Sequence, residues 1–259
     1  MISDMSGPAH PDLAGKVALV TGGSRGIGAA TCHALAANGV RVAVNGRDRA
    51  AIDAVVEKVT ADGGTAVAAP GDVTDETAVR DMRDTIERAL GPVEILAAFA
   101  GGQGAPAPTT QLGSDRWRAI VESDLTSVFI TVAAFLPAMI ERGGGSIITM
   151  ASTAGRQPSG ANAAYAAAKA GVVMFTKHLA NEVGGHGIRV NCLAPSAVLN
   201  ERMQRFMSAE QLEELASAYP LGRIGQPGDI AQAVLYLASD ASSWVAGVTL
   251  DLTGGRVIV

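Results

Sequence analysis

Short apolar runs alternate with longer stretches of helical period along most of the chain. Residues 16–22 read KVALVTG, an alanine-rich stretch follows to Asn38, residues 40–46 read VRVAVNG, and a further periodic stretch ends at Ala61. Short runs rich in β-branched residues favour strands, whereas apolar residues that recur every three or four positions favour helices. The first sixty residues therefore predict a strand, a helix, a second strand and a second helix.

The same alternation continues to the end of the chain. Further strands are predicted at residues 65–72, 94–101, 146–152, 188–196 and 248–254, and further helices at about 75–90, at about 115–142 and through Tyr165. Several of these runs are apolar throughout, which is typical of strands buried on both faces of a parallel sheet. The pattern therefore predicts an α/β fold: a single Rossmann-type, three-layer domain with a seven-stranded parallel sheet and helices on both faces.

Two parts of the chain lie outside this alternation. Residues 1–12 hold little to bury, so we expect a flexible tail before a domain that spans residues 13–259. Residues 200–225 form a less regular insertion before the last helix and strand. The apolar side chains of this insertion either close over a substrate as a lid or pack into the core; they are Met203, Phe206 and Met207.

Composition and charge exclude several classes of function. The formal net charge is -5, and no long basic run is present, so we expect no nucleic-acid partner. No segment approaches the roughly 18 apolar residues of a membrane span, and the opening residues do not resemble a signal peptide, so we expect a cytoplasmic protein with no membrane partner. The histidines and cysteines share no metal-ligand spacing, which predicts no metal site and leaves Cys32 and Cys192 as buried, reduced thiols.

A glycine-rich turn follows the first predicted strand. Residues 21–28 read TGGSRGIG, and a helical stretch begins at once. Glycine lets the backbone turn tightly and approach a pyrophosphate, while the helix N-terminus offers unpaired N–H groups and a partial positive charge. The context favours a dinucleotide-binding turn over an ordinary glycine-rich turn. The cofactor contacts predicted here are Gly22, Ser24, Arg25, Gly26, Ile27 and Gly28.

The end of the second predicted strand bears on the choice of dinucleotide. An NAD site usually has an acidic residue there for the ribose hydroxyls, but this chain has Gly46. Arg47 follows, and Arg25 lies in the glycine turn, so two guanidinium groups are available for a 2′-phosphate. We therefore expect NADP(H) to be preferred over NAD(H). The alternative is that one of the arginines is an ordinary solvated surface charge.

Three polar residues are predicted to converge at the carboxyl ends of the strands. Tyr165 and Lys169 are four residues apart in a helical stretch, which places them on one helix face, and Ser152 ends a strand. Hydride transfer to a carbonyl needs a proton donor, and the reverse reaction needs a base. Tyr165 suits that role, because a nearby Lys169 ammonium favours the phenolate and lowers its pKa. Ser152 would steady the substrate oxygen. The alternative is that Tyr165 and Lys169 are four residues apart by chance, as such pairs are in many helices.

These motifs together resemble the classical short-chain dehydrogenase/reductases, most closely the branch of 3-oxoacyl-[acyl-carrier-protein] reductases. The resemblance extends from about residue 13 to 255 and implies that Ser152, Tyr165 and Lys169 are catalytic. It also implies a small carbonyl or alcohol substrate and a homotetramer or homodimer, paired partly through the long helices after the fourth and fifth strands. The further cofactor contacts that it implies are Gly46, Arg47, Asp72, Val73, Ala100, Gly101, Tyr165, Lys169, Pro195, Ser196 and Val198.

The chain departs from the family pattern at three places. Residues 98–101 read Ala-Phe-Ala-Gly where the family has Asn-Asn-Ala-Gly, which removes two polar side chains at the end of a strand. Ser196 replaces a glycine, and Asn200 replaces a threonine that often contacts the carboxamide. Asp124 replaces the asparagine linked to the catalytic lysine.

Asp124 leads to a hypothesis about the working pH. An ionised carboxylate near Lys169 would stabilise the ammonium, partly cancel its effect on Tyr165 and move the working pH upward. The alternative is that only the backbone carbonyl matters at this position, which aspartate retains.

The sequence thus predicts an NADP(H)-dependent oxidoreductase that acts on a ketone or secondary alcohol. The departures leave one competitor, a catalytically impaired nucleotide-binding sensor or scaffold of the same fold. The substrate and the physiological direction of the reaction do not follow from the sequence.

Overall fold

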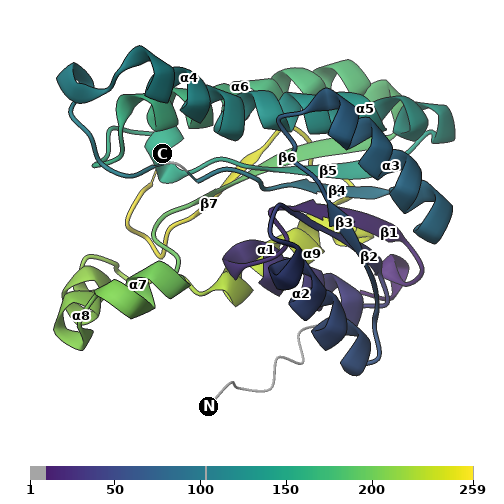
Figure 1. Ribbon diagram of the computed structural model, residues 1–259, viewed down its shortest axis with the longest axis horizontal. Helices are drawn as coiled ribbons and strands as arrows, with labels where there is room; N and C mark the ends of the chain where they lie inside the picture. Colours follow the sequence, from purple (N-terminus) through teal and green to yellow (C-terminus); the bar gives the residue numbers. More distant parts are fainter. Residues whose placement is uncertain (1–9, 103, 259) are drawn as a thin grey trace.

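Seven parallel strands form one sheet in the order β3-β2-β1-β4-β5-β6-β7, in a computed structural model that describes residues 10–102 and 104–258 (Figure 1). This confirms the predicted seven-stranded sheet. The order reverses between β1 and β4, and ligands of such sheets bind beyond the carboxyl ends of the strands at that point. The strands are β1 (Val17–Thr21), β2 (Arg41–Gly46), β3 (Thr65–Pro70), β4 (Ile95–Ala98), β5 (Gly145–Met150), β6 (Ile188–Pro195) and β7 (Thr249–Leu252).

Helices cover both faces of the sheet, as predicted (Figure 1). One face carries α1 (Gly26–Ala37), α2 (Arg49–Ala61) and α9 (Pro227–Ala238). The other carries α3 (Glu76–Leu90), α4 (Ser114–Val121), α5 (Ser127–Arg142) and α6 (Ala163–Val183). β1, β4 and β5 are buried on both faces, because alternate side chains enter a separate apolar cluster on each side of the sheet.

The helix predicted at about 115–142 is interrupted near its middle. A π-helical turn, Glu122–Thr126, joins α4 to α5, and its Asp124 is fully buried. Such a turn contains one residue more than an α-helical turn and occurs often at functional sites. Periodicity could not reveal the extra residue, since the apolar positions on either side still read as one helix.

The same segment corrects one expectation about membranes. Ser114–Arg142 is long and apolar enough to cross a membrane by length and composition alone, whereas no such segment was expected from the sequence. The core helices of water-soluble proteins pass the same test, and 44% of the most apolar window of this segment is buried inside the structure. α5 also contributes Val128, Val132 and Phe135 to the apolar cluster between the sheet and the helices on this face.

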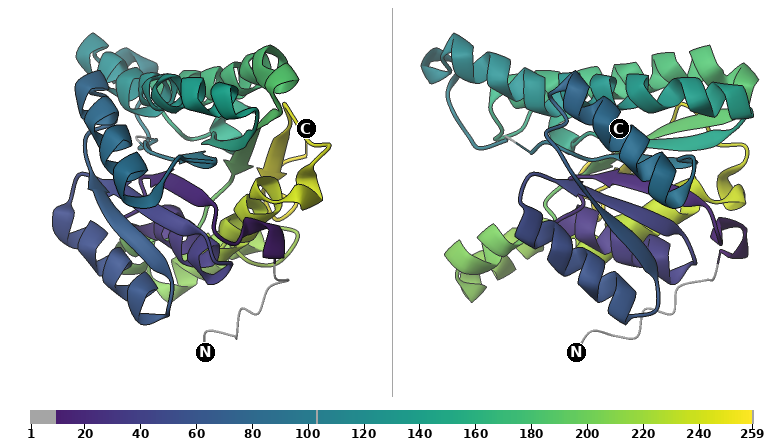
Figure 2. Two further views of the ribbon diagram at one scale, coloured as in Figure 1. Left: turned by 90° about the vertical axis from the view of Figure 1, so that its right-hand side faces the viewer. Right: turned by 45° about the vertical axis from the view of Figure 1, so that its right-hand side comes forward.

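The two irregular parts of the chain differ in how they meet the core. Of the predicted tail, residues 1–9 lie outside the described residues, while Pro11–Leu13 forms a short 3-10 helix with Leu13 fully buried. The predicted insertion contains α7 (Glu201–Phe206) and α8 (Ala209–Ser217), which extend sideways beyond the layer of α1, α2 and α9 (Figure 2). The Phe206 side chain is 70% exposed, so it is not a core residue.

Candidate active site

Ser152, Tyr165 and Lys169 meet at the carboxyl end of β5. Tyr165 lies in the first turn of α6 with Lys169 one turn further along, and the Ser152 side chain lies beside the Tyr165 phenol, near enough to affect its pKa. The Lys169 ammonium lies 5.5 Å from the centroid of the Tyr165 ring and donates to the Met150 carbonyl at 3.0 Å. The structure thus brings together the three side chains that the sequence singled out.

A buried carboxylate joins this group. Asp124 Oδ1 lies 3.2 Å from Lys169 Nζ, and the two residues are 0% and 2% exposed. The same Oδ1 accepts a hydrogen bond from the Gly102 backbone N–H at 2.6 Å, and the Ser123 hydroxyl donates to Oδ2 at 2.7 Å. The carboxylate itself therefore faces Lys169 and also holds the loop that follows β4.

The pKa of Tyr165 is raised above its ordinary value, contrary to the expectation that Lys169 would lower it. Burial of the phenol is the largest cause, because it disfavours the charged phenolate. The hydrogen bond with Ser152 lowers the pKa, and the negative charge of Asp124 raises it. Desolvation of the phenol therefore outweighs the expected lowering of its pKa by Lys169. The spacing of Tyr165 and Lys169 in the sequence could not reveal this burial.

The glycine turn between β1 and α1 has the geometry of an anion cradle. Gly22 and Gly26 have φ of +64° and +50°, which side chains other than glycine rarely adopt. A Cβ on Gly28 would lie 2.1 Å from the Gly22 carbonyl oxygen, so no larger residue fits there. α1 begins at Gly26, and the side chain of its N-cap residue, Arg25, makes no hydrogen bond to the first turn. Backbone donors close to the turn fit the pyrophosphate of a dinucleotide.

Both arginines proposed for a 2′-phosphate lie beside carboxylates. Arg25 forms an ion pair with Asp48, and Arg47 Nη1 lies 3.9 Å from Asp72 Oδ2. The side chains of Arg25 and Arg47 are 58% and 79% exposed, so both reach solvent near the end of β2. The pKa of Asp72 is lowered, chiefly by the hydrogen bonds from the Thr74 backbone N–H and hydroxyl, and then by Arg47.

A threonine that the sequence analysis did not single out connects two strands at the same edge of the sheet. Thr21 Oγ1 accepts hydrogen bonds from the backbone N–H groups of Phe99 at 2.9 Å and Ala100 at 3.1 Å. These contacts join the ends of β1 and β4 through the backbone of residues 99 and 100. The loss of two asparagine side chains at residues 98 and 99 therefore leaves this edge connected.

Asn162 is a second residue that the sequence analysis missed. It is 0% exposed and is the N-cap of α6: its Oδ1 accepts from the Tyr165 backbone N–H at 2.9 Å, and its Nδ2 donates to the Ala105 carbonyl at 3.0 Å. The loop of Ala105 lies against the catalytic candidate, since a Cβ on Gly104 would be 3.1 Å from ring atoms of Tyr165. An asparagine three residues before the tyrosine is a helix-cap signal that could have identified it.

A third set of contacts links the loop after Ser152 to the last strand. Arg156 donates two hydrogen bonds to Asp251 on β7, at 3.1 and 3.0 Å, and both side chains are mostly buried. Two parallel bonds of this kind fix the orientation of the guanidinium plane. The loop that carries Arg156 is thus held at the same edge of the sheet as Ser152.

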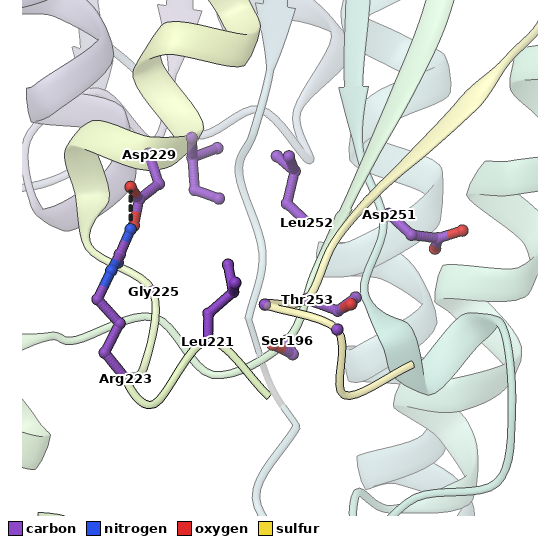
Figure 3. A pocket seen from close by; sticks show the side chains of 11 residues that line it. Ser196, Leu221, Arg223, Gly225, Asp229, Asp251, Leu252 and Thr253 are labelled. Atoms are coloured by element: carbon purple, nitrogen blue, oxygen red, sulfur yellow. Dashed lines mark hydrogen bonds and ion pairs between the residues drawn. The ribbon is translucent and has the colours of Figure 1, made fainter. Parts of the chain in front are cut away.

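The segment implied to lie near a nicotinamide borders a pocket of about 280 Å³. Ser196 lines the pocket with apolar side chains that include Leu221 and Leu252, while Asp251 points away from it (Figure 3). Pro195 ends β6, and Val198 pairs with residue 225 across an isolated bridge. Asn200 caps α7, with its Oδ1 accepting from the Met203 backbone N–H at 3.0 Å.

The remaining sequence predictions concern sulfur and metals. Cys32 and Cys192 are buried free cysteines. Among residues 10–102 and 104–258, no group of three or more His, Cys, Asp or Glu side chains is placed to hold a metal ion.

Comparison with known proteins gives consistent matches over nearly the whole chain. The short chain dehydrogenase family matches residues 16–211. The 3-oxoacyl-[acyl-carrier-protein] reductase FabG of Escherichia coli K12 is 37% identical over 245 residues, covering 95% of this chain and 98% of that protein. Gluconate 5-dehydrogenase of Gluconobacter oxydans is 37% identical over 254 residues, covering 96% and 99%. A solved structure of 7α-hydroxysteroid dehydrogenase complexed with NADH and 7-oxo glycochenodeoxycholic acid is 34% identical, with a TM-score of 0.90 and 98% of each chain covered.

Proposed function

This chain belongs to the short-chain dehydrogenase family, and from that membership we propose that it transfers hydride between NADP(H) and a ketone or secondary alcohol. One observation carries the proposal: the Tyr165 phenol lies beside the Ser152 side chain and one helical turn from the buried Lys169 ammonium. The glycine turn at the start of α1 lies at the same edge of the sheet and fits the pyrophosphate of the cofactor. The family membership makes the chain an oxidoreductase; the cofactor preference and the residue roles below are our proposals.

Each member of the trio has a role in proton transfer. The nicotinamide, when bound, supplies or accepts the hydride. Tyr165 gives its phenol proton to the oxygen of a ketone that is being reduced, or accepts the proton of an alcohol that is being oxidised. Ser152 holds the same substrate oxygen by hydrogen bonding. Lys169 favours the phenolate, and the Asp124 carboxylate keeps the buried ammonium paired.

The preference for NADP(H) rests on the end of β2. Gly46 cannot bind the ribose hydroxyls as an acidic residue would, and Ser24 Oγ lies only 2.9 Å from where its Cβ would be. Arg25 and Arg47 place two cations near this point, on the glycine turn and after β2. A 2′-phosphate would gain charge-assisted hydrogen bonds from both. The contacts proposed along the rest of the cofactor are those of Asp72, Val73, Ala100, Gly101, Pro195, Ser196 and Val198.

The substrate is proposed to enter beneath α7 and α8. The exposed Phe206 on α7 supplies an apolar surface that could move over a bound substrate, and Leu221 beside the pocket in Figure 3 is also 70% exposed. The relatives named above act, by their names, on an acyl-carrier-protein thioester, a sugar acid and a steroid. These share a ketone or a secondary alcohol, so this group is the substrate feature that we propose for this chain.

A titration with reduced dinucleotides tests the proposal directly. Purified protein is titrated with NADPH and with NADH by nicotinamide fluorescence, and a panel of ketones that includes a 3-oxoacyl thioester is then added. We expect tighter binding of NADPH and its consumption with at least one ketone. Tight NADPH binding with no turnover on any ketone would favour the competing sensor or scaffold function, and the absence of binding would reject both.

The charge of Asp124 gives a prediction about pH. The Asp124→Asn variant removes a negative charge that raises the pKa of Tyr165, so we expect the limb of the kcat/KM profile that reports Tyr165 to move to lower pH. The measurement is kcat/KM for alcohol oxidation across the pH range in both proteins. An unmoved limb would mean that only the backbone carbonyl of residue 124 matters, and a limb at higher pH would contradict the proposed sign.

We also propose that the chain forms a homotetramer or a homodimer in the cytoplasm. Phe129 on α5 and Met174 on α6 are 53% and 63% exposed, and Phe129 contacts Phe175 edge to face with ring centroids 6.3 Å apart. Apolar side chains gathered on adjacent helices are typical of an association surface. Sedimentation equilibrium should give four or two times the chain mass of 26.2 kDa. A mass of one chain at all concentrations would reject self-association.

A further inference from the structure

The Asp48 side chain connects two parts of the proposed cofactor site. Asp48 is the N-cap of α2, and its Oδ1 accepts a hydrogen bond from the Ala51 backbone N–H at 3.2 Å. Its other oxygen, Oδ2, pairs with Nη2 of Arg25 in the glycine turn. One carboxylate thus holds both the start of α2 and a guanidinium of the turn between β1 and α1.

We propose that Asp48 is a specificity-determining residue that limits how strongly the chain prefers a 2′-phosphorylated dinucleotide. The inference rests on the proposed function, in which Arg25 and Arg47 receive the 2′-phosphate. A phosphate that binds Arg25 either replaces the Asp48 carboxylate on Nη2 or uses the other guanidinium N–H groups, and in both cases it lies close to a second negative charge. Both effects act against NADP(H) and leave NAD(H), which has no 2′-phosphate, unaffected.

The contacts of Asp72 show why Asp48 is the stronger competitor of the two carboxylates. Asp72 Oδ1 accepts from the Thr74 backbone N–H at 3.0 Å and hydroxyl at 2.8 Å, and Arg47 lies 3.9 Å from its other oxygen. Arg47 therefore makes a looser pair and is free to turn toward a ligand. Arg25 is hydrogen-bonded to Asp48 directly, so one of its three nitrogens, Nη2, is already occupied by a carboxylate.

Exposure sets the size of the expected effect. The side chains of Arg25 and Asp48 are 58% and 49% exposed, so water and salt weaken their attraction. Removing the charge of Asp48 should therefore strengthen binding of a 2′-phosphate about three- to tenfold, the range expected for an exposed ion pair and a nearby like charge. The gain should shrink as salt is added.

The test uses a variant that removes the charge and retains the helix cap. Asn is as good an N-cap as Asp, so Asp48→Asn should leave α2 intact. Calorimetric titrations with adenosine 2′,5′-bisphosphate and with adenosine 5′-phosphate isolate the 2′-phosphate, because neither probe contains nicotinamide. We expect the bisphosphate to bind about three- to tenfold tighter to Asp48→Asn than to the wild type, with the affinity for the monophosphate unchanged. Unchanged or weaker bisphosphate binding, or an equal gain for both probes, would overturn the proposal.

Two further variants test whether Asp48 affects phosphate binding through Arg25. Asp53→Asn removes a carboxylate of the same helix that pairs with Arg49 at 2.8 Å, so it should leave both affinities unchanged. In an Arg25→Gln background, Asp48→Asn should give less than half of its gain, and a full gain there would overturn the role of Arg25. Because these probes require no hydride transfer, a chain that binds them as expected but reduces no ketone would reject the proposed enzymatic activity while leaving this inference standing.

Discussion

Tyr165→Phe is expected to lower kcat about a thousandfold while leaving dinucleotide affinity and stability nearly unchanged. Loss of a general acid or base removes about 10²- to 10⁴-fold of rate, and the proposed mechanism assigns that role to the phenol hydroxyl alone. The ring remains, so the space that it fills beside Gly104 stays filled. The measurements are steady-state turnover on a ketone from the panel, the NADPH titration and the midpoint of urea unfolding.

A matched variant controls for loss of a tyrosine hydroxyl in general. Tyr236, near the end of α9, is 38% exposed, and Tyr236→Phe should keep the wild-type kcat. A Tyr165→Phe variant that retains more than a tenth of the activity would refute the proposed role of Tyr165. A variant that loses NADPH binding together with activity would point to a structural role for the hydroxyl.

Lys169→Met is expected to lower the free energy of unfolding by about 3–5 kcal/mol, because it leaves a buried carboxylate without its cation. Asp124 is fully buried, and the Lys169 ammonium is 3.2 Å from it. Urea unfolding followed by circular dichroism measures the loss. Activity should disappear as well, since the ammonium that favours the phenolate is absent.

A substitution of Asp124, the other member of the ion pair, supplies a control for the Lys169→Met prediction. In an Asp124→Asn background the buried group is neutral, so Lys169→Met should cost less than in the wild type. Lys177→Met makes the same substitution at an exposed position of α6 and should change the free energy of unfolding by less than about 0.5 kcal/mol. If Lys169→Met is equally costly with Asp or Asn at residue 124, the ion pair is not the source of the stability.

Much of the fold could be predicted from the sequence because the relevant signals are local. Short apolar runs that alternate with stretches of helical period predicted each strand, and the spacing of Tyr165 and Lys169 placed both on one helix face. The rule that ligands bind at the carboxyl ends of parallel strands then brought Ser152 to the same place. Each of these inferences needed only neighbouring residues and the general topology of parallel sheets.

The contacts that could not be predicted join residues far apart in the sequence. Thr21 binds the backbone N–H groups of residues 99 and 100, and Asn162 binds the carbonyl of Ala105, across 78, 79 and 57 positions respectively. Backbone groups carry no sequence signature, so nothing in the chain marks their partners. The raised pKa of Tyr165 depends in the same way on burial, which only the packed structure determines.

The π-helical turn lets the segment Ser114–Arg142 place a carboxylate against Lys169 and also pack apolar side chains into the core. Each residue advances an α-helix by about 100°, so one added residue rotates everything after it by that angle relative to everything before it. The helix face that is directed at Lys169 and the helix face that packs against the sheet can therefore point in different directions within one continuous helical segment. Asp124 lies within the turn, and Val128, Val132 and Phe135 follow it on the buried stripe. Removing one residue from the turn would rotate α5 relative to α4 by about 100°. Either the Asp124 carboxylate would then move away from the Lys169 ammonium, or the apolar side chains of α5 would move out of the core.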